Sequence, residues 1–252
     1  MVGSGLLSVT FRKLSPVDVI RLTGEAGLQA IEWGGDIHVP HGDVKAAAEV
    51  GRLTAESGIR VASYGSYYRA GIPDSAKVGF ASVLETAIAL GAPSIRVWAG
   101  DKGSADTDEA WREQVAADTR AIAEIAMKEG VTIDFEYHAR TLTDTADSAV
   151  LLMELIDHPN VRCNWQPPVN ETFEQRLDGL KRISPWLANV HVFHWGVGVK
   201  YPLADGSDDW LRYIQAVRET EKRAYLMLEF VKDESPEQFL RDAETLKRLI
   251  AD

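Results

Sequence analysis

The amino-acid sequence predicts a (β/α)8 barrel, in which eight parallel strands alternate with helices around a closed core. Three observations lead to this fold class. A helix-Gly-strand join recurs along the chain, a series of short apolar runs follows, and helical patterns fill the intervals between the runs. The runs begin roughly 20 to 40 residues apart, which is the span of one βα unit. Eight such units account for a chain of 252 residues.

The joins are glycines that end a helical pattern and directly precede an apolar run, at Gly27, Gly58, Gly91 and Gly130. Glycine adopts the left-handed conformation at a helix C-terminus with little strain, so it ends a helix cleanly. An apolar run of about six residues is typical of a strand that is buried on both faces. The predicted strands are Leu6–Phe11, Leu28–Trp33, Ile59–Ser66, Ser94–Ala99, Val131–Glu136, Val161–Trp165, Asn189–His194 and Ala224–Phe230.

Helix starts are indicated by capping residues. Ser235 followed by Gln238 has the spacing of a capping box, with a proline between them at the first helical position. Thr172 and Gln175 repeat the box, and Ser15 begins a weaker version. These signals lie between the predicted strands, as an alternating βα order requires.

A doubly wound open sheet is the alternative fold. That fold usually carries a Gly-rich phosphate loop after its first strand, and residues 11–16 contain no glycine. The sequence also shows no linker, low-complexity tract or shift in composition. We therefore expect one barrel domain over residues 1–252.

The composition argues against several classes of protein. The chain has 27 basic and 38 acidic residues, a net charge of -11, and such a chain repels phosphate backbones, so we expect no nucleic-acid partner. Its one cysteine, Cys163, excludes a disulfide framework and a Cys-rich zinc site. The N-terminus lacks the pattern of a signal peptide, and no apolar run approaches the roughly 18 residues of a membrane span. We expect a cytoplasmic protein without a membrane partner.

Polar residues stand at the ends of the last four predicted strands, where a barrel of this kind places its active site. They are Glu136, Gln166, His191 and Glu229. Each also has a structural interpretation, as a solvated loop residue, a capping amide or a satisfied core histidine. Glu229 fits that interpretation least well, because a carboxylate inside an apolar run is costly to bury unless it is paired, protonated or bound to metal.

These four residues form a candidate metal site. Consecutive strands occupy one half of the barrel rim, so the tips of the last four strands can converge. Carboxylate and amide oxygens with one imidazole nitrogen suit a hard or borderline divalent ion such as Mn²⁺ or Mg²⁺. We expect Glu136, Gln166, His191 and Glu229 to bind such an ion.

Other polar and aromatic residues would face the same mouth and bind substrate. Aromatic rings suit the C–H faces of sugars, and arginine or histidine suits hydroxyls and carboxylates. The same side chains have an ordinary interpretation as packing at the barrel top, and Glu32 and Arg96 also face the mouth. The candidate substrate-binding residues are His38, Tyr67, Arg69, Trp98, His138, His194 and Lys200.

At these strand ends the chain resembles the xylose isomerase-like TIM barrels, a superfamily of ketose epimerases, isomerases, dehydratases and class II AP endonucleases. The family pattern is Glu, Asp, His and Glu at the ends of strands five to eight. Glu136, His191 and Glu229 match it, and His138 matches a histidine that often follows the first glutamate. The resemblance covers nearly the whole chain by strand order and implies a TIM barrel that self-associates in some relatives.

Two positions depart from the family pattern. Gln166 stands where the family has Asp, so the site would hold two carboxylates instead of three, with lower metal affinity and a more strongly Lewis-acidic ion. The usual His-x-Lys-Asp of strand seven is replaced by residues 191–194, which end in a second histidine. The position in the family pattern favours His191 over His194 as the ligand.

The resemblance implies a metal-dependent isomerase or epimerase that acts on a small sugar or polyol through an enediolate. Glu136 and Glu229 would be the catalytic acid and base. One alternative uses the same site for dehydration or another lyase step. A second alternative, favoured by Gln166, is a barrel without metal that serves as a binding module or partner subunit. DNA repair is disfavoured by the acidic charge and by the small number of histidines.

Overall fold

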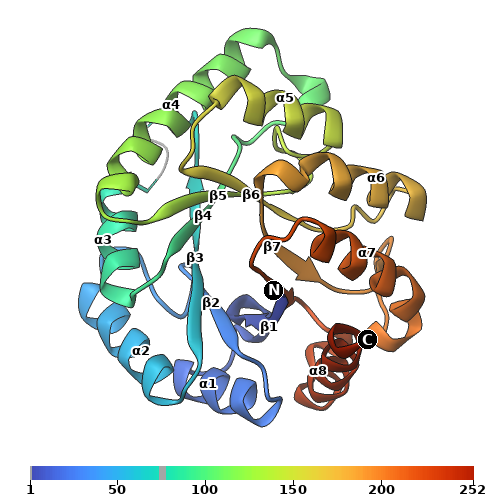
Figure 1. Ribbon diagram of the computed structural model, residues 1–252. Coiled ribbons are helices and arrows are strands. Elements are labelled where there is room, and N and C mark those ends of the chain that lie inside the picture. Colours follow the sequence, from blue (N-terminus) through green and yellow to red (C-terminus); the bar gives the residue numbers. More distant parts are fainter. Residues whose placement is uncertain (1, 74–77) are drawn as a thin grey trace.

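The protein is described by a computed structural model that covers residues 2–73 and 78–252. Parallel strands form one closed barrel, and helices form a ring outside it (Figure 1). The strands of the barrel are β1 (Val2–Leu7), β2 (Ala30–Gly34), β3 (Arg60–Arg69), β4 (Ser94–Trp98), β5 (Thr132–Glu136), β6 (Val161–Trp165), β7 (Leu187–Val192) and β10 (Ala224–Leu228). The barrel closes where β1 pairs with β10, Leu6 opposite Leu228. This confirms the predicted (β/α)8 fold.

The outer ring holds the long helices that connect successive strands (Figure 1). A two-stranded hairpin of β8 (Trp195–Gly196) and β9 (Val199–Lys200) interrupts the loop after β7. Within the described part of the chain, no helix combines the length and the apolar character that a membrane crossing requires. The helices are α1 (Pro16–Glu25), α2 (Val44–Glu56), α3 (Phe80–Leu90), α4 (Glu109–Lys128), α5 (Ala146–Ile156), α6 (Phe173–Ile183), α7 (Ser207–Glu219) and α8 (Pro236–Ala251).

The four glycine joins are confirmed. Gly27, Gly58, Gly91 and Gly130 have φ of 67°, 76°, 74° and 71°, in the left-handed region. A strand of the barrel begins two or three residues after each of them. The glycines therefore set the points at which the chain turns from the outer ring back into the barrel.

The first predicted strand, Leu6–Phe11, is wrong in its boundaries. The strand is Val2–Leu7, and residues Ser8–Phe11 form a short 3-10 helix. A Cβ at Gly5 would lie 2.5 Å from the Met227 sulfur and 2.7 Å from the Ala30 carbonyl oxygen, so β1 needs glycine to approach both neighbouring strands. The glycines that allow this approach also hide the strand from a search for apolar runs.

The capping predictions are confirmed in different degrees. Thr172 and Gln175 form the complete capping box. Ser235 accepts a hydrogen bond from the Gln238 amide, but the Gln238 side chain donates to Asp242 at 2.7 Å instead of turning back to the cap. The predicted box at Ser235 is thus only half formed, because the Gln238 Oε1 atom that would accept from the cap accepts from Arg241 instead, at 2.8 Å.

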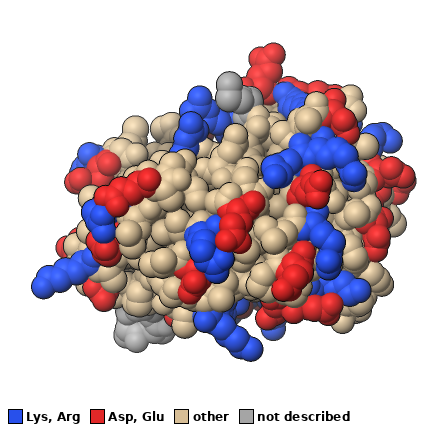
Figure 2. All heavy atoms as spheres, turned by 90° about the horizontal axis from the view of Figure 1, so that it is seen from below, with Lys and Arg blue, Asp and Glu red and all other residues tan. Residues whose placement is uncertain are grey.

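Successive side chains of a strand point to opposite faces, so each strand contributes to two environments, the apolar core and the barrel interior. On β5, Ile133 and Phe135 belong to the apolar core, whereas Asp134 and Glu136 are buried polar groups of the other face. Asp134 pairs with Arg162 at 3.0 Å. Figure 2 shows that the charged side chains on one outer side of the ring are of both signs and interspersed. Buried charged groups are thus found inside the barrel, whereas the charged side chains in this view are exposed on the outer surface.

Candidate active site

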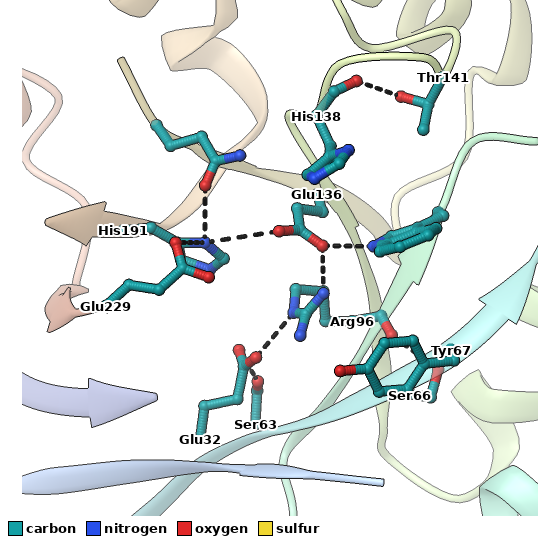
Figure 3. Close-up of polar contacts among 12 residues, drawn as sticks. Glu32, Ser63, Ser66, Tyr67, Arg96, Glu136, His138, Thr141, His191 and Glu229 are labelled. Carbon is teal, nitrogen blue, oxygen red and sulfur yellow. Dashed lines mark hydrogen bonds and ion pairs between the residues drawn. The ribbon is translucent and has the colours of Figure 1, made fainter. Parts of the chain in front are cut away.

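Three of the predicted metal ligands meet at the C-terminal end of the barrel. Glu136 ends β5, His191 lies in β7, and Glu229 directly follows β10. One potential ligand atom from each lies within 4.8 Å of the others, and all three residues are buried. The His191 Nδ1 atom is 3.5 Å from Glu229 Oε2 and 3.8 Å from Glu136 Oε1. Figure 3 shows the two carboxylates on either side of the imidazole.

Gln166, which follows β6, joins this cluster. Its Oε1 atom lies 3.1 Å from His191 Nδ1, so the other three predicted ligands surround this nitrogen of the fourth. His194 lies elsewhere, with its ring beside Tyr201 and in contact with the backbone at Gly206. The geometry thus favours His191 over His194 as a ligand. We call Glu136, Gln166, His191 and Glu229 the donor cluster.

The donor set fits a divalent cation. It offers carboxylate and amide oxygens and one imidazole nitrogen, the mixture that Mg²⁺ and Mn²⁺ accept. Burial by itself lowers the pKa of His191, but Glu229, Glu32 and Glu136 outweigh burial and raise the pKa above its ordinary value. The cluster is therefore an electronegative pocket that favours a positive charge at its centre.

An ion-paired chain that the sequence did not predict supports Glu136 from below. Arg96 on β4 is buried; its Nε donates to Glu32 Oε1 at 2.7 Å and its Nη1 donates to Glu136 Oε2. Ser63 donates to the other oxygen of Glu32 at 2.5 Å. We call Glu32, Arg96 and Glu136 the ion chain. Its three charged groups lie on β2, β4 and β5 and satisfy one another without solvent.

Gly65 on β3 makes room for the ion chain. Its ideal Cβ would lie 2.7 Å from Glu32 Oε1 and 2.8 Å from Arg96 Nη2, so a larger residue here would have to displace one of the two side chains. Glu32 and Arg96 were expected only as residues that face the mouth. A glycine at this level of the intervening strand is the signal that could have indicated their pairing.

The ion chain makes the two oxygens of Glu136 unequal. Oε2 accepts hydrogen bonds from Arg96 and from the Trp98 indole, whereas Oε1 faces His191. Burial alone would raise the pKa of Glu136, but Arg96, followed by His191, outweighs it and lowers the pKa below its ordinary value. Glu136 is therefore held as a carboxylate whose second oxygen is already occupied.

Trp98 brings together several of the predicted substrate-binding residues. The His138 ring is stacked on it with centroids 5.0 Å apart, and the Arg69 guanidinium lies 4.0 Å from its ring centroid. Tyr67 meets it edge-on at 5.8 Å. Because Trp98 also donates to Glu136, this aromatic group is continuous with the donor cluster.

The other predicted substrate-binding residues lie apart from this group. Both ring nitrogens of His38 are engaged, Nδ1 at 3.0 Å from Ser8 Oγ and Nε2 at 3.2 Å from the Leu14 carbonyl, which favours a structural role. Lys200 pairs with Glu234 at 3.1 Å. Contact of His194 or Lys200 with a substrate stays a prediction.

Two cavities flank the segment from His138 to Arg140 at the barrel mouth. One, of about 340 Å³, is lined by Gln166, Phe193 and Trp195, and so opens onto the donor cluster. The other, of about 530 Å³, is bounded by Arg69 and Trp98. Both volumes are in the range of small-molecule sites.

Comparisons with known proteins agree with this architecture. The model of the xylose isomerase-like TIM barrel family matches residues 20–249. A 3-dehydroshikimate dehydratase of Bacillus anthracis is 33% identical over 98 residues, which cover 38% of this chain and 35% of the relative. The match thus spans about a third of that relative's length.

Solved structures share the fold over nearly the whole chain. A probable 3-DHS dehydratase from Bacillus anthracis has a TM-score of 0.82 at 21% identity, with 97% of this chain and 98% of that chain covered. D-psicose 3-epimerase with D-tagatose from Clostridium cellulolyticum has a TM-score of 0.75 at 15% identity, with coverage of 99% and 98%.

A similar protein from Mycobacterium smegmatis in complex with magnesium has a TM-score of 0.75 at 15% identity, with coverage of 99% and 97%. At these identities the structural likeness shows the fold and leaves the reaction open. Together with the match of the family model over residues 20–249, it shows that this chain belongs to the xylose isomerase-like TIM barrel family.

Proposed function

We propose that this chain is a metal-dependent dehydratase that acts on a small polyhydroxylated keto compound. It removes a proton from a carbon next to the carbonyl and expels a hydroxyl group from the neighbouring carbon as water. The observation that carries this proposal is the unequal environment of the two glutamates in the donor cluster. Isomerisation or epimerisation of a ketose, which uses the same first proton transfer, is the second candidate.

The donor cluster would hold the metal. Glu136, Gln166, His191 and Glu229 suit Mg²⁺ or Mn²⁺, and a neighbour with this fold is described as a magnesium complex. When bound, a divalent ion polarises a substrate carbonyl and makes the adjacent C–H bond more acidic. The side chains of this protein then have to bind the substrate, exclude water and move the proton.

An epimerase of the two-carboxylate kind needs a group on each face of the reacting carbon that can both gain and lose a proton. Glu136 does not meet this requirement, because Arg96 and Trp98 occupy its Oε2 atom and the donor cluster engages its Oε1 atom. Among the described residues, Glu229 forms an ion pair only with His191. This asymmetry supports chemistry with one base over exchange between two equivalent carboxylates.

His138 is the side chain best placed to act as that base. Its Nδ1 atom lies 2.7 Å from the Ala139 carbonyl oxygen, so Nδ1 carries the proton and Nε2 presents a lone pair. The ring lines both cavities and lies on the side of Glu136 away from Arg96 (Figure 3). His138 can thus reach a substrate that sits over the donor cluster.

The proposed elimination balances without another reactant. His138 Nε2 takes the proton, the electrons of the C–H bond form a carbon–carbon double bond, and the neighbouring C–O bond breaks. The protonated His138 returns its proton to the departing hydroxyl, which leaves as water. His138 is then neutral again and ready for the next cycle.

The mass of the product distinguishes the two candidates. The Mg²⁺-loaded or Mn²⁺-loaded protein is incubated with 3-dehydroshikimate and, separately, with D-tagatose, compounds that the similar proteins suggest. We expect the first to lose water and the second to be recovered unchanged. Conversion of the ketose to an isomer of equal mass, with no loss of water from 3-dehydroshikimate, would support the epimerase instead. If the chain binds neither ion, a binding module without metal is the interpretation that remains.

Substitution of His138 tests the assignment of the base. His138→Asn is expected to lower kcat by about 10²- to 10⁴-fold, the usual contribution of a general base, while the Mg²⁺ affinity measured by calorimetry stays at the wild-type value. Glu229→Gln is expected to lower both. His158 lies just before β6, at the other end of the barrel, and His158→Asn is the matched control. Wild-type turnover in His138→Asn would exclude His138 as the base.

A further inference from the structure

We propose that the cavity beside Trp98 binds an anionic group of the substrate, a carboxylate or a phosphate, through Arg69 and Arg140. We call it the arginine cavity. This inference rests on the proposed function, to which it adds the charge class of the substrate. Its lining includes Arg69, Trp98, Asp101, His138, Arg140 and Thr141.

The arginine cavity adjoins the reaction site. Trp98 forms part of its wall, and the indole of the same residue donates to Glu136 in the donor cluster. His138, the proposed base, also lines it. The cavity holds about 530 Å³, which leaves room for a charged group together with its water. One substrate can therefore place its reacting carbon near His138 and its anionic group between the arginines.

The charge of the cavity is positive although the chain has a net charge of -11. Two guanidinium groups, of Arg69 and Arg140, stand against one carboxylate, of Asp101, in its wall. Among the residues that the structure describes, neither arginine forms an ion pair with a carboxylate. Burial lowers the pKa of Arg69, and Arg140 lowers it further while Asp101 opposes the change. An anion between the arginines would relieve their mutual repulsion.

The Arg69 side chain and the backbone that carries Arg140 are held in position before any ligand arrives. Arg69 lies over the Trp98 ring and donates to the Gly100 carbonyl at 3.3 Å. Arg140 has a left-handed backbone, with φ of 62°, which is uncommon outside glycine and recurs at ligand sites. The turn that carries it is closed by a hydrogen bond of 2.7 Å from Thr141 Oγ1 to the His138 carbonyl. The planar guanidinium of Arg69, fixed over Trp98, and that of Arg140 on the neighbouring turn suit the paired oxygens of a carboxylate or phosphate.

Calorimetric titration with inorganic phosphate and with malonate tests the cavity without any turnover. The full chain is titrated with and without Mg²⁺, because phosphate that binds the metal would need the ion. We expect at least one of the two anions to bind under both conditions. In the double variant Arg69→Gln/Arg140→Gln we expect binding at least about tenfold weaker, as for loss of a charge-assisted hydrogen bond.

The double variant Arg21→Gln/Arg52→Gln removes the same charge from α1 and α2, where both arginines are exposed and paired with glutamates on their own helix. We expect wild-type anion binding in this control. Equal weakening in both double variants would mean that only the net charge matters, and binding that needs Mg²⁺ and survives Arg69→Gln/Arg140→Gln would place the anion on the metal. Either result overturns the proposal, as does the failure of both anions to bind.

Kinetics separate this inference from the proposed reaction. If 3-dehydroshikimate is dehydrated, Arg140→Gln should raise its KM about tenfold or more with a smaller effect on kcat, because the arginine binds a part of the substrate that does not react. An unchanged KM would contradict the inference and leave the dehydratase proposal intact. Conversely, anion binding at the arginines in a chain that dehydrates nothing would support the cavity and refute the reaction.

Discussion

The two halves of the barrel mouth treat buried charge differently. On the β2 to β5 side, Arg96 neutralises Glu32 and Glu136 in a hydrogen-bonded chain. On the β6 to β10 side, Gln166 and Glu229 each approach His191, at 3.1 Å and 3.5 Å, and no lysine or arginine of the described residues forms an ion pair with Glu229. Buried carboxylates need a compensating charge. One half receives that charge from a permanently charged arginine, and in the other it would come from a bound ion or from protonation of His191.

Removal of Arg96 from the first half should give the largest loss of stability. Arg96→Met leaves two buried carboxylates without their cation, and loss of one partner of a buried ion pair costs about 3–5 kcal/mol. We expect a fall of that size in the free energy of unfolding, measured by urea denaturation near neutral pH. The pair of Arg12 with Asp36 is more exposed, so Arg12→Met should cost no more than about 1 kcal/mol.

A second substitution checks the cause of this loss. Glu32→Gln added to Arg96→Met removes one of the two unpaired carboxylates and should restore part of the stability. If the double variant is as unstable as the sum of the two single variants, the charges do not act through each other and the ion chain is not a unit.

Adding a carboxylate to the second half tests whether the donor cluster binds a metal ion through residue 166. Gln166→Asp gives the donor cluster a third carboxylate and should tighten Mn²⁺ binding by about tenfold or more, because affinity for divalent ions rises with the ligand charge count. Calorimetric titration with Mn²⁺ measures the change. Gln215→Asp makes the same change on the exposed face of α7 and should bind Mn²⁺ like the wild type. Equal affinities in all three proteins would show that Gln166 is not a ligand.

Substitution of His38, which belongs to neither half, should have the smallest effect on stability. Burial lowers its pKa from 6.5, although the Leu14 carbonyl opposes this, so the folded protein favours the neutral ring. The stability due to this ring is complete above pH 6.5 and is lost as the pH falls toward the lowered value.

His38→Gln removes the titration and keeps a polar side chain. The stability gap between wild type and variant should therefore be about 1 kcal/mol at neutral pH and narrow toward about pH 5. Urea denaturation at several pH values measures it. A gap that stays constant over this range would show that the ring does not titrate in the folded state as expected.

The sequence predicted the fold and the positions of Glu136, His191 and Glu229 because strand ends in a barrel are a strong positional constraint. The sequence could not tell which inward-facing polar residues lie at the barrel mouth and which lie in the layer beneath it. Asp134 has the same inward direction as Glu136, yet it is a structural partner of Arg162. Depth in the barrel depends on strand register, which residue spacing alone does not reveal.

The pairing of Glu32 with Arg96 was missed for a related reason. The two residues lie on strands that are not neighbours, and the glycine on the strand between them leaves room for their contact. The partners of the His38 ring could not be read from the sequence either. A histidine in a polar, Gly-rich loop suggests a substrate ligand, and this stays a prediction, but the groups that engage its ring, the Ser8 hydroxyl and the Leu14 carbonyl, come from a separate segment of the chain.

The notch that Gly65 leaves in β3 has a consequence for comparing members of this family. A side chain at this position would crowd the Glu32–Arg96 pair, since a Cβ would lie within 2.8 Å of both charged groups, and one of the two would have to shift. We therefore expect the three positions to vary as a set among relatives. Glycine at this position would then accompany a guanidinium beneath the mouth, and a larger residue would accompany a displaced or substituted pair.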